Sequence, residues 1–399
     1  MIQEDLFVPD SKSLSLARSG RMNYLILIAV IILAGMSQGM LLPVLSILLE
    51  QKGVSSSLNG LNAAALYVGS FAMTLVAERV LGAIGFKKLI AAGLALVLAA
   101  LLLFPLLTGV KIWFVLRLLV GIGDSAVNYA AQLWVLLMTP AEHRGRNLSL
   151  YGMSYGLGFS LGPLGISLLR FGQSAPFLIT ALLFVLVLLL VGLKLKDSRP
   201  EAMAHSEGQA SRFGRSYRLA WYALIPALLY GYMEASLNSN FPVYGLRIGF
   251  STDQIAALLP FAGIGGLLLQ LPLGIWSDRY GRKAILIAAG TGGGLAFTLL
   301  PLAGEHFLLT LLLLMVAGGL VGSFFSLGLS YAADILPRKL LPAANVVSSF
   351  HYSLGSIAGP GIGGVLLQTG WGGSVFALMG GLYMMFGLAG LLFSPRKSI

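Results

Sequence analysis

Long apolar runs separated by short polar segments dominate the pattern of this chain. Residues 23–49, 89–110, 171–193 and 307–333 contain no charged side chain. Each run is long enough to cross the hydrocarbon core of a bilayer as a helix, which takes about 20 residues. The pattern therefore predicts an all-α integral membrane protein with many spans.

Twelve spans are predicted, six on each side of a polar segment rich in Ser, Arg and Glu, residues 196–218. Such a segment is typical of a linker between two bundles. The predicted domains are an N-terminal bundle, 1–195 with a tail at 1–22, the linker 196–218, and a C-terminal bundle, 219–399. The predicted spans are 23–49, 58–82, 87–109, 111–138, 146–170, 174–195, 219–246, 252–277, 283–303, 307–337, 341–369 and 372–394.

Charge is scarce and unevenly placed. Only 10% of the 399 residues are charged, although the net charge is +11; soluble domains average about 25% charged residues. On the predicted topology, 21 Lys and Arg residues lie on the side of the termini and the linker, 4 lie on the other side, and Arg117 lies inside a span. This asymmetry predicts that both termini and the linker are cytoplasmic. It also assigns the basic charge to topology and anionic lipid, and not to a nucleic-acid partner.

Several classes of chemistry have no support in the sequence. The chain has no cysteine, so disulfide and thiol chemistry are absent. No Gly-x-x-x-x-Gly-Lys-Ser/Thr loop is present, so we do not expect ATP to drive the protein. The polar N-terminal tail has no apolar core and does not predict a cleavable signal peptide. The four histidines are scattered, which predicts no metal site: His143, His205, His306 and His351.

One charged loop stands between two apolar runs in the second half. It reads Gly274-Ile-Trp-Ser-Asp278-Arg-Tyr-Gly281-Arg-Lys-Ala-Ile-Leu286. The glycine at 281 permits a tight turn, and Asp278 can accept hydrogen bonds from a helix N-terminus or a nearby arginine. This pattern resembles the loop signature of the major facilitator superfamily of secondary transporters. A degenerate copy follows the second span, from Glu78 to Lys88. The predicted gate residues are Gly274, Asp278, Arg279, Gly281, Arg282, Lys283, Glu78 and Arg79.

The resemblance implies a fold and a way of working. It implies two six-helix bundles with pseudo-two-fold symmetry that rock about a central cavity. The charged loop and its degenerate copy would latch the cytoplasmic side. It also implies a monomer in the plasma (cytoplasmic) membrane of a bacterium, acting on a small molecule without a cofactor and driven by a proton gradient.

A glycine–proline motif recurs in the fifth span of each half. Small residues at this spacing let helices approach closely, and the proline weakens local backbone bonds. Exporters of the superfamily carry such a motif in their fifth span, but here the fuller copy is in span 11. Helix packing alone is the simpler interpretation of both copies. The residues are Gly158, Gly162, Pro163, Gly355, Gly359, Pro360, Gly363 and Gly364.

Three ionisable residues are expected inside the membrane, where a charge is costly and usually functional. Arg117 and Asp124 lie seven residues apart in span 4, on one helix face with Asn128. Glu234 lies near the middle of span 7, one turn before Asn238. The resemblance implies that Arg117 faces the cavity and aids proton transfer; the alternative is a bond to helix ends or loop carbonyls. Asp124 and Glu234 are each either a proton-coupling acid or a buried structural group.

The remaining candidates have simple structural alternatives. His351 in span 11 is either a proton relay or a packing residue with one satisfied bond. Asp334, four residues before Arg338, is expected in a surface or gate ion pair. Six tyrosines are candidates either for the cavity wall, where they would stack on an aromatic or cationic substrate, or for the core: Tyr67, Tyr151, Tyr155, Tyr230, Tyr232 and Tyr331.

These features favour a proton-driven antiporter that exports a small amphipathic or cationic compound. Two acids against one arginine inside the predicted spans favour a cationic compound. Proton symport, uniport or lipid flipping by the same fold is the runner-up. A non-transporting membrane receptor or assembly factor is the alternative from another class, because fold alone does not fix function.

Overall fold

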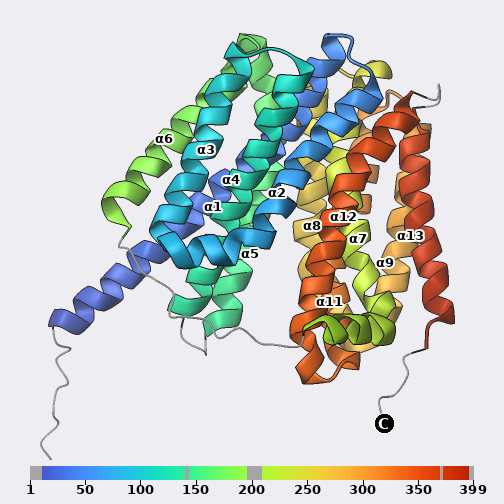
Figure 1. The fold of residues 1–399 in the computed structure, drawn as a ribbon. Helices are drawn as coiled ribbons and strands as arrows, with labels where there is room; N and C mark the ends of the chain where they lie inside the picture. Colours follow the sequence, from blue (N-terminus) through green and yellow to red (C-terminus); the bar gives the residue numbers. More distant parts are fainter. Residues whose placement is uncertain (1–10, 140–142, 196–208, 369–371, 395–399) are drawn as a thin grey trace, which may run out of the picture.

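The computed structural model describes residues 11–139, 143–195, 209–368 and 372–394. Within these ranges every regular element is a helix. The helices form two groups that stand side by side, α1–α6 and α7–α13 (Figure 1). The predicted all-α fold of twelve spans in two bundles is confirmed.

The first group comes from the first half of the chain. Its fifth span is α5 continued by the 3₁₀ segment η2. The elements are α1 (Ser11–Gln51), α2 (Ser56–Ile84), α3 (Phe86–Leu106), α4 (Val110–Met138), α5 (Arg144–Leu161), η2 (Gly162–Phe171) and α6 (Ala175–Lys194).

The second group has the same order of spans. Here α9 is continued by η3, and α10 and α11 together make the fourth span. The elements are α7 (Gln209–Arg247), α8 (Thr252–Tyr280), α9 (Arg282–Leu299), η3 (Leu300–Ala303), α10 (Phe307–Val321), α11 (Phe324–Ile335), η4 (Arg338–Leu340), α12 (Leu341–Leu367) and α13 (Ser374–Leu392).

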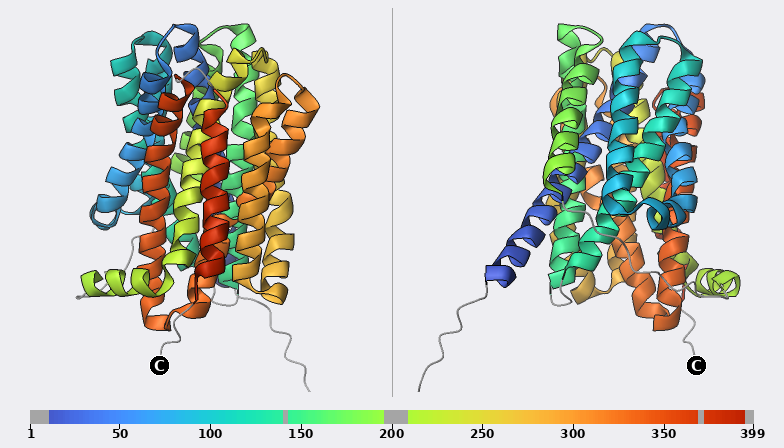
Figure 2. Two further views of the ribbon diagram at one scale, coloured as in Figure 1. Left: turned by 90° about the vertical axis from the view of Figure 1, so that its right-hand side faces the viewer. Right: turned by 60° about the vertical axis from the view of Figure 1, so that its left-hand side comes forward.

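The spans run between two ends of the molecule. The first described turn of α1 and the end of α13 lie at one end, which we call the terminal face (Figures 1 and 2). The turns at Gly85 and Gly281 lie at this face, and each glycine has a positive φ, +83° and +91°. Each ends one helix and begins the next, α2–α3 and α8–α9. The turns at Gly53 and Gly249 lie at the opposite face.

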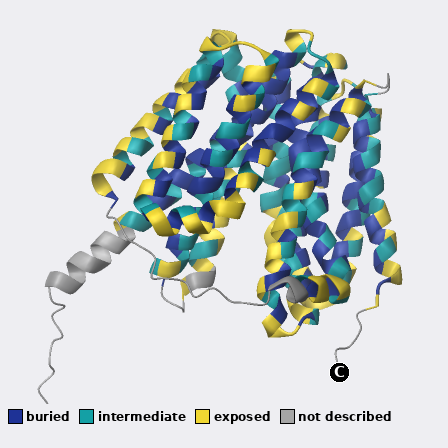
Figure 3. Cartoon of the chain, in the orientation of Figure 1, coloured by how far each residue is buried: buried dark blue, intermediate teal, exposed yellow. Residues whose placement is uncertain are grey.

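Eight helical segments of the described chain are long and apolar enough to cross a membrane. The four other spans are α4, α5 with η2, α7 and α12. They hold the buried polar groups Arg117, Asp124, Ser160, Glu234 and Ser356. Buried residues run along the inner sides of both groups of helices (Figure 3). Together with α1, which holds the buried Gln38, these four spans supply polar groups to the interior.

The halves repeat one packing arrangement, in which the first span contacts the fifth. A Cβ at Gly158 would lie 2.1 Å from the Ile32 carbonyl oxygen of α1. A Cβ at Gly355 would lie at the same distance from the Leu228 carbonyl oxygen of α7. The backbones approach so closely at these two points that only glycine fits.

The backbone has a different conformation at the two glycine–proline motifs. After Gly162 and Pro163 the chain continues as the 3₁₀ segment η2. Around Pro360, by contrast, α12 remains an α-helix to Leu367. The local weakening expected from the proline is thus visible in the first half alone.

Two predicted segments differ from the structure. The span predicted at 307–337 is broken between α10 and α11 at Gly322, where a Cβ would lie 2.8 Å from the Gly266 Cα of α8. Residues 196–208 of the predicted linker lie outside the described residues, and 209–218 form the beginning of α7. This beginning meets the rest of α7 at a kink at Ala220, where φ is −130° and ψ is 23°.

Candidate functional site

Arg247 joins the two halves at the opposite face. Its Nε donates to the Glu50 carboxylate at the end of α1, at 2.8 Å, and its Nη2 donates to the second carboxylate oxygen, at 3.2 Å. The same guanidinium donates to Ser56 Oγ in α2 and to the Leu367 carbonyl oxygen in α12. We call this set the Arg247 clamp. A bidentate pair fixes geometry as well as charge, so the clamp holds four spans together.

Sequence reasoning missed this clamp. Arg247 and Glu50 are 197 residues apart, and nothing in either neighbourhood indicates the other. Small residues beside the clamp bring the halves closer: a Cβ at Gly60 of α2 would lie 2.1 Å from the Pro360 carbonyl oxygen. Gly364, predicted as a packing residue, meets the Ser56 carbonyl oxygen across the same interface.

The second-half part of the internal site is centred on Glu234 in α7. This side chain is 7% exposed, and its Oε2 accepts a hydrogen bond of 2.8 Å from the Tyr352 hydroxyl of α12. The rings of Tyr230 and Tyr352 stack with centroids 6.0 Å apart. In the described part of the chain no lysine or arginine forms an ion pair with Glu234. The partner of the buried Glu234 carboxyl is therefore a phenol hydroxyl, that of Tyr352.

The first half contributes phenols to the same site. Tyr155 of α5 donates a hydrogen bond of 2.7 Å to Gln38 Oε1 of α1. Glu234 interacts electrostatically with the phenols of Tyr155 and Tyr67, although these belong to the other half. Helices α1, α2, α5, α7 and α12 thus meet around Glu234. We call Gln38, Tyr67, Tyr155, Tyr230, Glu234 and Tyr352 the central cluster.

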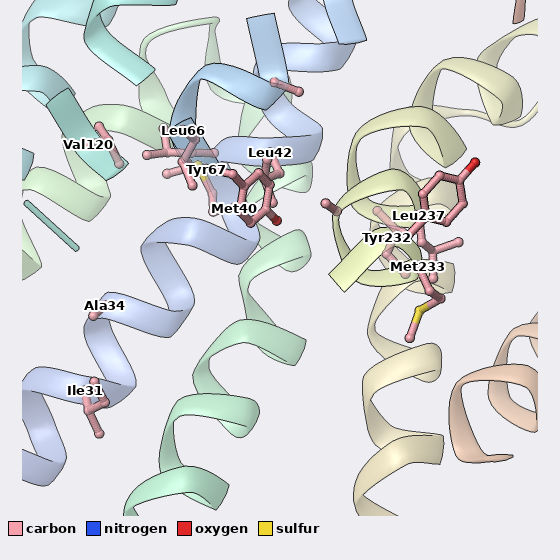
Figure 4. Close-up of a cluster of buried hydrophobic side chains, with 14 of the residues drawn as sticks. Ile31, Ala34, Met40, Leu42, Leu66, Tyr67, Val120, Tyr232, Met233 and Leu237 are labelled. Atoms are coloured by element: carbon pink, nitrogen blue, oxygen red, sulfur yellow. The ribbon is translucent and has the colours of Figure 1, made fainter. Parts of the chain in front are cut away.

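Apolar side chains flank this cluster in both halves. Figure 4 shows Tyr67 beside Met40 and Leu66 on the first-half side, and Met233 and Leu237 on α7. All of these side chains are buried. The central cluster therefore combines one carboxyl and several phenol rings with buried apolar neighbours.

Arg117 and Asp124 are buried in α4, at 1% and 3% exposure. Neither the three guanidinium nitrogens nor the two carboxylate oxygens have a hydrogen-bond partner among the described residues. Arg117 interacts electrostatically with Tyr67, and Asp124 with Tyr155. Two turns of helix, about 10.5 Å along the axis, separate the pair, so they do not neutralise each other directly. Each group therefore lies within electrostatic range of one phenol of the central cluster.

The two predicted asparagines bond to their own helices. The Asn238 amide donates to the Glu234 carbonyl oxygen at 2.8 Å, and the Asn128 amide donates to the Asp124 carbonyl oxygen at 3.2 Å. The Tyr151 hydroxyl in turn donates to Asn128. These side chains satisfy backbone groups one turn away and do not reach the two carboxyls.

His351 lies apart from Glu234, nearer the terminal face. Its Nδ1 is 3.1 Å from the Leu224 carbonyl oxygen, ten residues before Glu234 on α7. Its ring meets that of Tyr217 edge to face, with centroids 5.6 Å apart. This is the geometry of a packing residue with one satisfied hydrogen bond.

The six candidate tyrosines divide into two groups. Tyr67, Tyr155 and Tyr230 belong to the central cluster. Tyr151 bonds to Asn128, and Tyr331 packs against Tyr222 with ring centroids 6.4 Å apart. Tyr232 is buried where α7 meets Gly355 and Gly359 of α12. Tyr352, which bonds Glu234, was not among the candidates, because no feature near it in the sequence indicates a partner 118 residues away.

The charged loop is tied within its own half. Arg282 forms ion pairs with Asp278, at 3.0 Å, and with Asp334 at the end of α11, at 2.7 Å. Asp334 therefore has Arg282 as its partner, and not the nearby Arg338. The reason is that α11 ends at Ile335, so Asp334 and Arg338 do not share a helix face.

The other gate residues make fewer contacts. Arg279 lies over the Tyr280 ring, at 5.4 Å, and Gly274 accepts a hydrogen bond from Ser277. Glu78 and Arg79 are exposed on α2. In the described part of the chain no hydrogen bond or ion pair joins this loop copy to the loop at Gly281. The hydrogen bonds that join the halves within the described ranges lie at the opposite face, at Arg247.

Two repeated six-span bundles, joined at one face and enclosing buried ionisable groups, have the architecture of a secondary transporter. The family model of the Major Facilitator Superfamily matches residues 27–269 and 217–398. The chain belongs to this superfamily and is a transporter, not an enzyme.

Individual relatives agree with this assignment. The chain is 41% identical to YfkF, an uncharacterised MFS-type transporter of Bacillus subtilis (strain 168), over 88% of this chain and 90% of the relative. It is 25% identical to Multidrug resistance protein 2 of the same organism, over 86% and 88%. The structure of a D-xylose-proton symporter superposes with a TM-score of 0.76 at 14% identity, over 95% of this chain and 98% of that one. This last likeness shows the fold alone.

Proposed function

We propose that this transporter is a proton-coupled antiporter that exports a small amphipathic or cationic compound, with Glu234 as the coupling acid. The observation that carries the proposal is the Glu234 carboxyl, 7% exposed and bonded to the Tyr352 hydroxyl at 2.8 Å. A lone carboxyl in a low-dielectric site favours a proton or a cationic ligand, because an isolated buried charge is costly.

The central cluster explains how one site can exchange a proton for a cationic substrate. Protonated Glu234 is neutral and keeps its hydrogen bond to Tyr352. Ionised Glu234 attracts a cationic substrate, which the phenol faces of Tyr67, Tyr155 and Tyr230 can also stabilise. Proton and substrate then compete for one carboxyl, and competition at a shared site produces antiport.

Asp124 is the alternative coupling acid, with Arg117 as its regulator. Both lack hydrogen-bond partners among the described residues, whereas Glu234 has one. In this alternative the proton binds in α4, and Glu234 only binds the substrate. The two acids differ in position, so single substitutions separate the alternatives.

The contacts between the halves support an inward-facing state. The Arg247 clamp closes the opposite face, while the two charged loops at the terminal face are not bonded to each other in the described chain. We place the terminal face in the cytoplasm on the basis of the Lys and Arg distribution. The substrate site would then open to the cytoplasm, where an exporter loads.

Similarity to a relative named Multidrug resistance protein 2 supports export. The motif in span 5 supports it less, because Gly165-Ile166 replaces the final glycine pair of the exporter pattern. Proton symport is the competing function within the same fold.

The test is transport by proteoliposomes under an imposed proton gradient, with a panel of cationic, neutral and anionic amphipathic compounds. We expect Glu234→Gln, which mimics the protonated acid, to abolish uphill transport while sparing some downhill exchange. Tyr352→Phe, which removes the hydrogen bond and keeps the ring, should weaken proton coupling and leave substrate binding. Asp124→Asn is the competing variant.

Each outcome decides between named alternatives. If Glu234→Gln concentrates substrate as well as the parent while Asp124→Asn does not, the coupling site is in α4. Accumulation of substrate on the same side as the entering protons would establish symport. If the protein neither transports nor binds any of these compounds, the non-transporting alternative is favoured.

A further inference from the structure

A short helical segment at the terminal face is not part of any span. Residues 209–219 form the beginning of α7, and the kink at Ala220 turns them away from the rest of that helix. Figure 2 shows this yellow-green segment lying across the base of the second half, at a steep angle to the spans and projecting beyond them. We call it the surface helix. A helix at this angle and at the ends of the spans is oriented to lie along a membrane surface.

The surface helix is fastened to α12 and η4. Ser216 is fully buried, and its hydroxyl donates a hydrogen bond of 3.3 Å to the Leu340 carbonyl oxygen. One residue further on, the Tyr217 ring meets the His351 ring edge to face at 5.6 Å. These contacts fix the rotation of the helix about its own axis, so its remaining faces have defined surroundings.

Those faces differ in chemistry. Phe213 and Tyr217, four residues apart, share one face, and Tyr217 is 43% exposed although it packs on His351. Arg215 and Arg218, three residues apart, share another face and are both exposed. Aromatic rings with adjacent arginines are typical of a helix at the boundary between acyl chains and headgroups.

The neighbouring segment adds further positive charge. Arg338 and Lys339 in η4 are exposed and directly precede Leu340, which accepts the hydrogen bond from Ser216. Neither 209–220 nor 336–345 contains an acidic residue. Four exposed cationic side chains therefore lie on two segments that contact each other, and neither segment supplies a carboxylate to neutralise them.

We propose that the surface helix and η4 form a binding site for the phosphate headgroup of an anionic membrane phospholipid. Arg215 and Arg218, with Arg338 and Lys339, bind the phosphate, while Phe213 and Tyr217 lie against the acyl chains. Arginine suits this role because its planar donor fork matches phosphate oxygens. The site anchors the second bundle at the membrane surface on the side where the bundles separate.

The test uses the cysteine-free chain and two open positions at the terminal face. A Cβ would meet nothing within 4 Å at Gly214 of the surface helix or at Gly82 of the first half. Gly214→Cys and Gly82→Cys each accept one fluorophore on the full-length protein. In nanodiscs of phosphatidylcholine we then add spin-labelled phosphatidylglycerol or spin-labelled phosphatidylcholine and measure quenching.

We expect phosphatidylglycerol to quench the label at 214 more strongly than phosphatidylcholine does, and both lipids to quench the label at 82 alike. Arg215→Gln with Arg218→Gln should weaken phosphatidylglycerol association at 214 by about fivefold for each arginine lost. The matched control is Lys88→Gln with Arg146→Gln, which removes two exposed cations from the first half and should leave quenching at 214 unchanged. Raising the salt concentration should act like the double arginine variant.

Three results would overturn the proposal. Equal quenching by both lipids at 214 would mean that the helix lies in the membrane without recognising charge. Full selectivity in the double arginine variant would place the headgroup elsewhere. No quenching by either lipid would mean that the surface helix faces water, where a soluble anionic partner is the better candidate. The readout is independent of transport, so it does not depend on the proposed function.

Discussion

The two loops at the terminal face have the same backbone and opposite chemistry. Gly85 and Gly281 both take a positive φ, and each joins the second span of its half to the third. Two residues after each glycine comes a lysine that bonds the end of the sixth span: Lys87 to the Gly192 carbonyl oxygen, and Lys283 to that of Phe393. The fold of the loop is therefore repeated in both halves.

The residue directly after each glycine differs. In the first half it is Phe86, 1% exposed and stacked on Trp134 of α4 with ring centroids 5.2 Å apart. In the second half it is Arg282, paired with Asp334 near the end of the fourth span. An apolar contact thus occupies the place of a switchable ion pair.

The acid differs as well. Asp278 lies three residues before Gly281, whereas Gly82 lies three residues before Gly85 and Glu78 lies one further turn away. This explains the stretched spacing of the degenerate copy. Glycine and lysine therefore suffice for the turn. The charges of the second loop serve another purpose, which we infer to be gating.

The largest expected effect is a loss of folding stability, and it should differ between the two loops. Phe86→Ala removes a buried ring and should cost about 3–5 kcal/mol, as such core substitutions do. Arg282→Gln removes ion pairs to two exposed acids and should cost only about 0–1 kcal/mol. Thermal unfolding in detergent, followed by circular dichroism, measures both. Phe86→Leu, which keeps most of the apolar volume, is the control for the first variant.

Equal losses of stability in the two variants would contradict this contrast. The proposed gating role requires in addition that Arg282→Gln alter transport with little loss of stability, and that Phe86→Ala lose stability.

A smaller effect is expected at the opposite face. Arg247→Gln should release Glu50 and shift the population away from the clamped state by about fivefold, the equivalent of about 1 kcal/mol for a partly exposed pair. Spin labels at Gln51→Cys and Asp253→Cys, which are exposed on the two halves, report the separation by pulsed electron resonance. Arg170→Gln removes an exposed cation next to Phe171 and serves as the control.

Distances that stay the same in Arg247→Gln would show that small-residue packing at Gly60 and Gly364 closes this face without the clamp.

The smallest effect tests the shared part of the two loops. Lys87→Gln and Lys283→Gln should each lower stability by about 0.3–1 kcal/mol, since each removes one cation near a helix C-terminus. The two losses should be similar, because the two bonds are equivalent. A large loss in one half alone, measured by the same unfolding assay, would show that the repeat is only superficial there.

Local information in the sequence determined much of the fold. Apolar runs of membrane length predicted twelve spans, and the loop from Gly274 to Leu286 predicted the superfamily. The positions of Arg117, Asp124 and Glu234 predicted buried ionisable groups, and all three are buried. These features could be predicted because hydropathy and turn chemistry act over a few residues.

Only the tertiary structure decided which groups meet. Tyr352 bonds Glu234 across 118 residues, Arg247 bonds Glu50 across 197, and Asp334 takes Arg282 as its partner across 52. The break at Gly322 likewise lies where the backbone approaches Gly266 of a neighbouring helix. The physical reason is that periodicity fixes the face on which a residue lies, whereas the packing of small residues fixes which helix that face contacts.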